Sequence, residues 1–156
     1  MSETDLVHKL TEIVTLKENR AQKALKIAQI IRESRSYRWV GIYDVDHQRG
    51  IVSNIAWSGP GAPAYPSFPL TKGITSRAIA TQKTINVGNV GSDSDYLTAL
   101  GSTQSEIIVP VLDDSTSQVI GTIDVESEVP NAFDSGTQAL LEQCARALRN
   151  FWTANV

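Results

Sequence analysis

The sequence predicts an α+β fold, in which a central antiparallel sheet carries long helices on one face and irregular loops on the other. Apolar residues recur at helical spacing near both ends of the 156-residue chain, whereas the middle is rich in β-branched and aromatic residues. The predicted strands follow one another as hairpins, which pair antiparallel. The length fits one domain over 1–156, divided into an N-terminal helical segment (1–35), the sheet with its pocket loops (36–130) and a C-terminal helix (131–156).

The N-terminal segment carries the signals of helix initiation. Ser2 with Asp5 three positions later is a capping signature, and apolar residues then follow at helical spacing: Leu6, Leu10, Ile13 and Leu16. Asn19 can cap a further stretch, which has one apolar face: Ala24, Ile27, Ala28 and Ile31. This pattern fits either one bent helix or two helices.

After this helical segment the residue pattern becomes that of a β-hairpin. Residues 38–45 are aromatic and β-branched, residues 47–50 read as a turn, and residues 51–57 form a second strand-like run. The next segment, 58–69, holds four prolines and two glycines, so we expect a long loop without any regular element. Loops of this length are often functional.

Shorter elements are predicted in the middle of the chain. A short helix is expected over 74–81 and a short strand over 84–87. Residues 88–104 are polar and form a second loop, in which 95–100 could make one or two helical turns.

The two most apolar strands come late in the sequence. They are predicted at 105–112 and 119–127, joined by a hairpin loop at 113–117. A final helix is predicted to begin at Phe133 and Asp134. Its apolar stripe consists of Leu140, Leu141, Cys144, Leu148 and Phe151.

The composition argues against several classes of function. The net charge is −3 and the basic residues are scattered, which is unlike a protein that binds nucleic acid. The N-terminus lacks the features of a signal peptide, and no run reaches the roughly 18 apolar residues of a membrane span. Cys144 is the only cysteine, so neither an intramolecular disulfide nor a cysteine-based metal cluster can form. We therefore expect a cytoplasmic domain that needs no cofactor and no metal.

Acidic residues lie inside the two apolar strands, at Glu106, Asp124 and Glu126. A buried carboxylate is costly unless hydrogen-bond donors or positive charge stabilise it. Strand alternation places Asp124 and Glu126 on one face, together with Ile120 and Thr122. Glu106 joins them only if the hairpin register pairs it with Asp124 or Glu126. Clustered carboxylates raise each other's pKa, and the ammonium group of a ligand would relieve that strain.

Other interpretations of these acids stay open. Glu126 could be solvated at a strand end, beside Ser127 and Glu128. A metal site is a weak alternative, because neither His8 nor His47 is placed to complete it. A glycosidase-type pair of carboxylates fits the chemistry, but the sequence indicates no cleft in which a sugar could stack.

Motifs along the chain form a set: Trp39-Val40-Gly41-Ile42-Tyr43, Gly59-Pro60, Thr71-Lys72-Gly73-Ile74, Ser105-Glu106-Ile107-Ile108-Val109-Pro110-Val111 and Gly121-Thr122-Ile123-Asp124-Val125-Glu126-Ser127. Together they resemble a GAF domain, and more narrowly the free methionine-(R)-sulfoxide reductases, which are stand-alone GAF proteins. The resemblance runs from Trp39 to the final helix, and the last two motifs are its most specific part.

The resemblance implies a ligand pocket. The acidic trio of that family falls on Glu106, Asp124 and Glu126, where Glu126 replaces the more usual Asp, and its aromatic wall falls on Trp39 and Tyr43. In that family the acids engage the polar groups of the free amino-acid substrate, and the aromatic side chains hold its methyl end. The same residues are therefore the predicted ligand-binding residues of this chain.

The resemblance also implies that the catalytic cysteines are missing. Their positions align with Tyr65, Thr75 and Ala99, and none of these side chains can replace a thiol that attacks sulfur. Cys144 lies one helical turn from Leu148, which predicts a packed core thiol. We expect no catalytic residues, although other enzymatic activity stays open.

Three functions fit these observations. The first is a non-catalytic sensor or regulatory protein that binds a small, amino-acid-like ligand in the acidic and aromatic pocket. The second is a sulfoxide-reductase-like enzyme with unorthodox or lost catalysis, and the third is a dimeric interaction module with a vestigial pocket. The first and last helices correspond to the usual GAF dimerisation surface, so we expect a homodimer. A bilin would need a cysteine in the pocket region, and the phosphate of a cyclic nucleotide suits an acidic pocket poorly.

Overall fold

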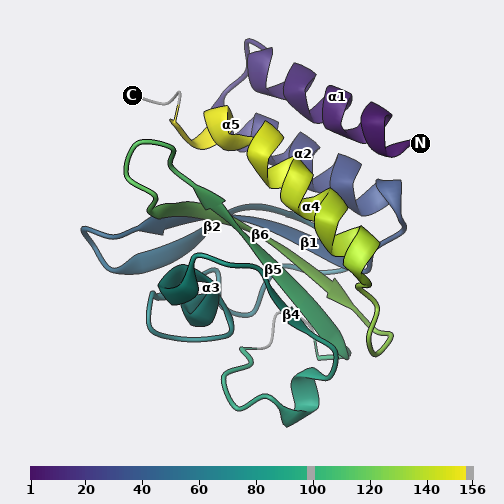
Figure 1. Cartoon of the computed structure of the whole chain (residues 1–156), viewed down its shortest axis with the longest axis vertical. Coiled ribbons are helices and arrows are strands. Elements are labelled where there is room, and N and C mark those ends of the chain that lie inside the picture. Colours follow the sequence, from purple (N-terminus) through teal and green to yellow (C-terminus); the bar gives the residue numbers. More distant parts are fainter. Residues whose placement is uncertain (98–100, 154–156) are drawn as a thin grey trace.

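The computed structural model describes residues 1–97 and 101–153, and it contains one antiparallel sheet with helices on one side and loops on the other (Figure 1). The helices are α1 (Glu3–Thr15), α2 (Arg20–Ser34), α3 (Thr75–Thr81), α4 (Ser135–Ala147) and α5 (Arg149–Thr153), with a 3₁₀ turn, η1, at Val90–Ser92. The strands are β1 (Trp39–Asp46), β2 (Ile51–Ser58), β3 (Ser67–Pro69), β4 (Ile85–Val87), β5 (Ser105–Leu112) and β6 (Val119–Ser127). The predicted α+β architecture is confirmed. Of the helices in the described part of the chain, none combines the length and the hydropathy that crossing a membrane requires.

The central strands of the sheet carry all of the predicted site residues. Within the described residues the strand order is β3-β2-β1-β6-β5-β4, and every neighbouring pair is antiparallel. Trp39 of β1 lies opposite Glu126 of β6, and Gly41 lies opposite Asp124. On the other side of β6, Glu106 of β5 also lies opposite Glu126. The central position of β6 thus places its acids between residues of β1 and β5.

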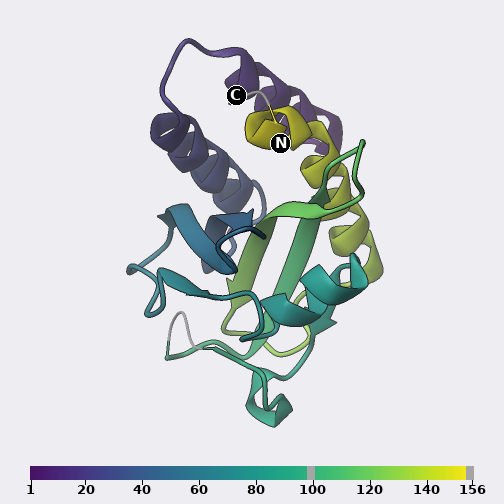
Figure 2. The same ribbon diagram turned by 90° about the vertical axis from the view of Figure 1, so that its left-hand side faces the viewer.

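Helices α1, α2, α4 and α5 lie on one side of the sheet (Figures 1 and 2). The N-terminal segment forms two helices, because each has its own capping box: Ser2 with Asp5, and Asn19 with Gln22. Leu16 between them has an extended backbone that ends α1. Both predicted N-caps are therefore confirmed, and the choice between one helix and two is settled.

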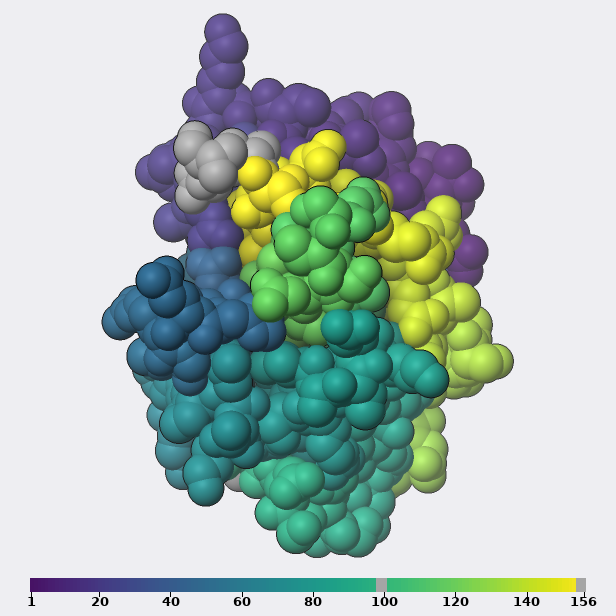
Figure 3. All heavy atoms as spheres, turned by 60° about the vertical axis from the view of Figure 1, so that its left-hand side comes forward, coloured from purple at the N-terminus to yellow at the C-terminus, as the bar shows by residue number. Residues whose placement is uncertain are grey.

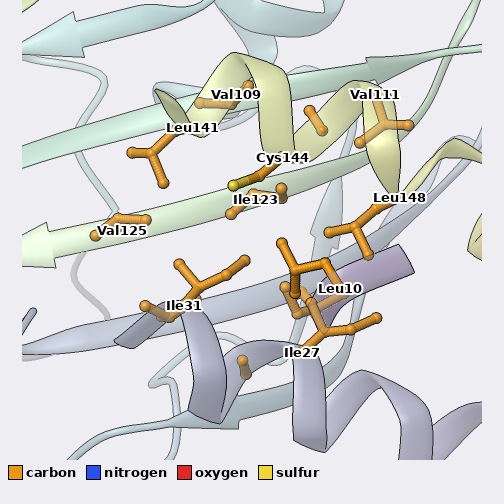
Figure 4. Close-up of a cluster of buried hydrophobic side chains, with 14 of the residues drawn as sticks. Leu10, Ile27, Ile31, Val109, Val111, Ile123, Val125, Leu141, Cys144 and Leu148 are labelled. Atoms are coloured by element: carbon orange, nitrogen blue, oxygen red, sulfur yellow. The ribbon is translucent and has the colours of Figure 1, made fainter. Parts of the chain in front are cut away.

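A hydrophobic core fills the space between the sheet and the helices (Figure 4). The helices contribute Leu10, Ile27, Ile31 and Leu141, the junction of α4 and α5 contributes Leu148, and the strands contribute Val109, Val111, Ile123 and Val125. Burying one such side chain completely stabilises the fold by about 1.5–3 kcal/mol. Cys144 is buried in the same core, as its helical spacing predicted.

The opposite face of the sheet is covered by α3 and by the two predicted loops (Figure 2). In Figure 3 the teal segment between β2 and β5 forms the lower part of the surface on this side. The first loop is fastened to β1, because Nε1 of Trp39 donates a hydrogen bond to the carbonyl of Gly61 at 3.0 Å. This arrangement encloses the face that carries the acids.

One part of the segment predicted to be irregular, 58–69, forms a strand. β3 pairs with β2 at the edge of the sheet, and the N–H of Asn54 donates to the carbonyl of Pro66 at 2.7 Å. Pro69 is tolerated there because an edge strand can present a residue without an N–H toward solvent. The prediction was wrong for these three residues of β3.

Within the predicted helical turns at 95–100, the described residues 95–97 are not helical. The turn η1 lies earlier, where the side chain of Asn89 accepts a hydrogen bond from the N–H of Gly91 at 3.0 Å. Residues 95–97 are not helical, because this stretch turns toward β6 and brings Tyr96 to Glu126. The remaining residues of the prediction, 98–100, lie outside the described residues.

The predicted C-terminal helix, 131–156, is divided and begins later than expected. Asp134 is the N-cap of α4 rather than part of the helix, and it accepts a hydrogen bond from the N–H of Thr137 at 2.8 Å. The helix is interrupted at Leu148, the C-cap of α4, and α5 follows. The guanidinium of Arg149, the first residue of α5, donates a hydrogen bond to the carbonyl of Leu112 at 3.0 Å. The last three residues of the chain lie outside the described part.

A β-bulge in β6 moves Ile120 away from the face predicted for it. Val111 pairs with Gly121 and Leu112 pairs with Val119, which leaves Ile120 without a partner in β5. Val119 therefore packs with the aromatic cluster on the loop side, whereas Ile120 packs against the core on the helix side. The acids of β6 lie beyond the bulge and keep their shared face.

Candidate functional site

The side chains of Glu106, Asp124 and Glu126 converge on one face of the sheet. Glu106 and Glu126 are direct cross-strand partners, and Asp124 points to the same side because it lies two residues from Glu126. One carboxylate oxygen of each residue lies within 4.8 Å of the others. The register therefore meets the condition under which Glu106 joins the cluster.

These carboxyl groups are almost completely removed from solvent. Glu106 is 3% exposed, Asp124 7% and Glu126 0%, which excludes the alternative of a solvated Glu126. Burial raises the pKa of Asp124 to about 6 and the pKa of Glu126 to about 8. Burial and the neighbouring carboxylates raise the pKa of Glu106 well above its ordinary value. The raised pKa of Glu106 favours its protonated form, and at a pKa of about 8 Glu126 is largely protonated at neutral pH.

Two hydroxyl groups from the second loop bind Glu126. Oε1 of Glu126 accepts a hydrogen bond from the hydroxyl of Thr103 at 2.6 Å and one from the hydroxyl of Tyr96 at 3.2 Å. Thr103 is buried, and Tyr96 belongs to the stretch that closes over the face. Sequence reasoning missed both residues, because a hydroxyl in a polar loop has no spacing that distinguishes it from its neighbours.

Some polar atoms on this face have no hydrogen-bond partner within the described residues. They are Oδ1 of Asp124, Oε2 of Glu126 and Oγ1 of Thr122, all of them buried. A buried polar atom without a partner costs about 1–3 kcal/mol. The face thus presents acceptors that a ligand with N–H groups would satisfy.

The aromatic side chains of Trp39 and Tyr43 stand beside the acids on β1, and both are buried. Gly41 lies between them, and a Cβ at this position would come within 2.4 Å of the Trp39 ring and 2.7 Å of the Tyr43 ring. Only the absence of a side chain lets both rings pack there. The Tyr43 ring meets Phe68 of β3 edge-on, with centroids 6.0 Å apart and planes at 64°. Burial and then the charge of Asp124 raise the pKa of Tyr43, so its hydroxyl keeps its proton.

A small cavity of about 20 Å³ lies over the acids. Its lining includes the carboxyl groups of Glu106 and Asp124, the aromatic side chains of Tyr43, Tyr65 and Phe68, and the aliphatic hydroxyl of Thr75, and it is otherwise mostly apolar. A volume of this size holds roughly one water molecule. Among the predicted site residues, Tyr43, Glu106 and Asp124 line the cavity, whereas Trp39 and Glu126 are buried outside its lining.

The sequence resemblance predicted that Tyr65, Thr75 and Ala99 stand at the positions of the family's cysteines. Tyr65 and Thr75 line the cavity, and Ala99 lies outside the described residues. The single thiol of the chain, Cys144, lies in the core on the other side of the sheet (Figure 4). Burial raises the pKa of the Cys144 thiol to about 12, so it does not form a thiolate at neutral pH.

The second loop is attached to α3 next to the cavity. Arg77 donates to both carboxylate oxygens of Asp93, at 2.9 and 2.6 Å, and to Asp95 at 2.9 Å. These bonds lower the pKa of Asp93, because Arg77 stabilises its charged form. Leu97, two residues after Asp95, lines the cavity. The ion pairs of Arg77 thus hold the loop segment that covers the acids.

The acids could also supply oxygen ligands to a metal ion, since their carboxylates approach one another closely. Calcium takes about 6–8 oxygen ligands, and magnesium requires six in near-ideal octahedral geometry. Besides Glu106 and Asp124, however, the cavity offers mainly aromatic and aliphatic side chains. The donor set therefore suits an organic cation better than a hard metal ion.

The chain matches one protein family and several known proteins. The model of the GAF domain family matches residues 18–150. "GAF domain-containing protein A" of Dictyostelium discoideum is 25% identical over 146 residues, which cover 94% of this chain and 89% of that protein. Free methionine-R-sulfoxide reductase from Neisseria meningitidis, solved in complex with its substrate, is 25% identical with a TM-score of 0.86, covering 97% of this chain and 89% of that one. The type II enzyme from Thermoplasma acidophilum is 29% identical with a TM-score of 0.78, covering 93% and 96%.

Proposed function

The chain belongs to the GAF domain family, and we propose that it binds a small, amino-acid-like ligand whose ammonium group is held by Glu106, Asp124 and Glu126. In this proposal the protein is a sensor or regulatory module rather than a catalyst. Tyr43 contributes an aromatic wall to the binding site, and Trp39 supports it from behind by packing against Gly41 and holding the first loop.

One observation carries the proposal: Asp124 is 7% exposed, lines the cavity, and has an oxygen atom without a hydrogen-bond partner. Protein folds rarely leave such an atom unpaired. An ammonium group would donate hydrogen bonds to Asp124 and would stabilise the ionised form of its neighbours. Since the cavity has room for only about one water molecule, binding requires the covering loops to move outward.

A thermal-shift screen of amino acids, amines and cyclic nucleotides tests this proposal. A ligand at 100 times its Kd stabilises the folded state by about 2.7 kcal/mol, which gives a clear rise in Tm. Glu106→Gln should abolish that rise, because it replaces a carboxyl group of the site by an amide of the same size. Glu128→Gln is the matched control, since Glu128 is exposed and pairs with Arg38 at the end of β6. If no compound stabilised the wild type more than Glu106→Gln, the proposal would be rejected.

The absence of a suitable thiol supports a non-catalytic role. Reduction of a sulfoxide by thiol chemistry needs a thiolate to attack sulfur and a second thiol to form the disulfide. The chain has one cysteine, Cys144, and that thiol is buried in the helix-side core. Tyr65 and Thr75 at the cavity cannot perform this redox cycle.

A second candidate is a reductase-like enzyme, which is favoured by the similarity to two solved free methionine-R-sulfoxide reductases. The test is to incubate the protein with free methionine-(R)-sulfoxide and either thioredoxin or dithiothreitol, and to measure methionine. Cys144→Ser is the control. Turnover above that control would establish the enzyme and overturn the non-catalytic proposal, whereas equal rates would reject the thiol chemistry.

A further inference from the structure

We infer that the groove beside the free edge of β5 is a docking site for an extended, acidic peptide segment of a partner protein. The groove lies away from the acid cluster, so the inference does not depend on the ligand proposed above. It rests on the part of β5 that has no neighbouring strand, on the groove that lies at this edge, and on the basic side chains that line the groove.

The C-terminal half of β5 has a free edge. Strand β4 pairs only with Glu106, Ile107 and Ile108, so residues 109–112 have no neighbouring strand on that side within the described part of the chain. The backbone groups of such an edge can pair with a strand from another chain. At roughly 3.3 Å per residue, the free edge offers a length of about 13 Å to an added strand.

The backbone groups that face this open side belong to Pro110 and Leu112. The N–H of Asp113 donates to the carbonyl of Gln118 across the hairpin at 2.8 Å, so the alternation along the strand points Leu112 outward. Nε of Arg149 accordingly donates to the carbonyl of Leu112 from outside the sheet, at 3.0 Å. By the same alternation Pro110 faces outward, where its missing N–H costs no hydrogen bond to β6. The edge thus presents the carbonyl of Pro110 and the N–H of Leu112 to a peptide.

A groove of about 470 Å³ lies at this edge, and residues 109–112 form its floor. One wall comes from residues 82–84, which follow α3, and the other comes from α4 and Arg149. Figure 2 shows α3 and α4 on opposite sides of the sheet. The walls therefore stand on either side of the edge. Since the side chains of an added strand alternate between its two faces, they would meet both walls.

The charges in the groove are mostly basic, although the whole chain carries a net charge of −3. Lys83 on one wall and Arg146 on the other are exposed, and neither has an ion-pair partner among the described residues. Arg149 also lines the groove and pairs with exposed Asp114. The acid of the groove, Glu142, is engaged, since its Oε2 accepts a hydrogen bond at 2.6 Å from a threonine hydroxyl of the opposite wall. Carboxylates on both faces of an extended peptide complement these cations, and strand pairing fixes where they lie.

Fluorescently labelled peptides test the inference with the full chain. The probe is the peptide VTDEVT with blocked ends, in which the two adjacent acids face opposite walls, and VTNQVT and VTKKVT are its neutral and basic controls. Kd is measured by fluorescence anisotropy for the wild type, Arg146→Glu and Arg49→Glu. Arg49 is the matched control, because it is exposed in the turn between β1 and β2, outside the groove. Hydrogen exchange of the Leu112 amide, followed by NMR, reports whether the peptide pairs as a strand.

VTDEVT should bind at least about tenfold more tightly than VTNQVT, and VTKKVT should not bind. Arg146→Glu should weaken the binding of VTDEVT at least about tenfold, whereas Arg49→Glu should leave its Kd unchanged. Bound VTDEVT should slow the exchange of the Leu112 amide at least about tenfold. Equal affinity for the three peptides, equal losses in the two variants, or no binding would overturn the inference. Competition by inorganic pyrophosphate together with unchanged exchange at Leu112 would also overturn it, since the groove would then be a site for small anions.

Discussion

Glu106 and Glu126 face each other directly across β5 and β6, as two buried carboxyl groups in one cross-strand pair. Like charges in such a pair destabilise a sheet. The pair is accommodated because burial raises the pKa of both groups, so that protonation removes the repulsion near neutral pH. Both the stability of the fold and its affinity for a ligand should therefore depend on the protonation of these acids, and hence on pH.

The stability of the protein without ligand should fall as the pH rises. The folded-state pKa of Glu126 is about 8, above its ordinary 4.5. The folded state thus binds more protons, and this contribution to stability is complete below pH 4.5 and is lost as the pH rises through 8. Glu126→Gln should therefore flatten the curve and raise the free energy of unfolding at pH 8 by at least about 1.4 kcal/mol, the equivalent of one pKa unit. Urea unfolding from pH 5 to 8 measures this, with exposed Glu128→Gln as the control, and a rise in wild-type stability over this range would contradict it.

Ligand binding should release protons. An ammonium group favours ionised carboxylates, so binding lowers the raised pKa values of Asp124 and Glu126. The affinity for a cationic ligand should increase as the pH rises from 5 to 8, because fewer protons then have to be removed. Calorimetric titration at pH 7 in two buffers with different heats of ionisation measures the released protons. Equal heats in both buffers would show that the acids do not change protonation.

A side chain at position 121 should disturb the link between the helix layer and the pocket strand. Nε1 of Trp152 donates a hydrogen bond to the carbonyl of Tyr43 at 3.1 Å, and a Cβ on Gly121 would lie 2.1 Å from that nitrogen. Gly121→Ala should therefore destabilise the protein by about 1–3 kcal/mol, the usual range for overpacking. Chemical denaturation measures the loss, and near-UV circular dichroism reports the displaced Trp152. Gly61→Ala is the control, because no described residue lies within 4 Å of a Cβ there; equal stability of the two variants would refute the prediction.

The ion pairs of Arg77 should control the opening of the second loop. Arg77→Gln removes the bonds to Asp93 and Asp95, and it should lower global stability by less than about 1 kcal/mol, as for other exposed pairs. Amide hydrogen exchange over residues 93–97 should become faster, and ligand association should accelerate, because the loop covers the cavity. Arg35→Gln, which breaks an exposed pair with Glu3, is the control. Exchange at the wild-type rate in Arg77→Gln would mean that other contacts hold the loop.

We also propose the homodimer expected from the sequence, through the first and last helices. The apolar stripes of α1 and α4 are buried inside the chain, which leaves their more polar faces for such an interface. Light scattering at tens of micromolar should give twice the mass of the chain. The mass of a single chain would contradict the dimer.

Local patterns predicted the elements well, because capping and periodicity act over a few residues. The caps at Ser2 and Asn19 and the strands around the acids are where the sequence predicts them. The predictions failed where contacts between residues far apart in the sequence determine the structure. β3 exists because β2 offers it an edge, and the displacement of Ile120 depends on the pairing of β6 with β5.

The sequence by itself determined that Asp124 and Glu126 share a face of a strand, because side chains alternate along any strand. It also determined that a single cysteine, Cys144, is present. Only the tertiary structure decided that Glu106 faces Glu126, since the register of two strands depends on the whole hairpin. It alone brought the hydroxyls of Tyr96 and Thr103 to the acids, because these contacts join residues more than twenty positions apart in the chain.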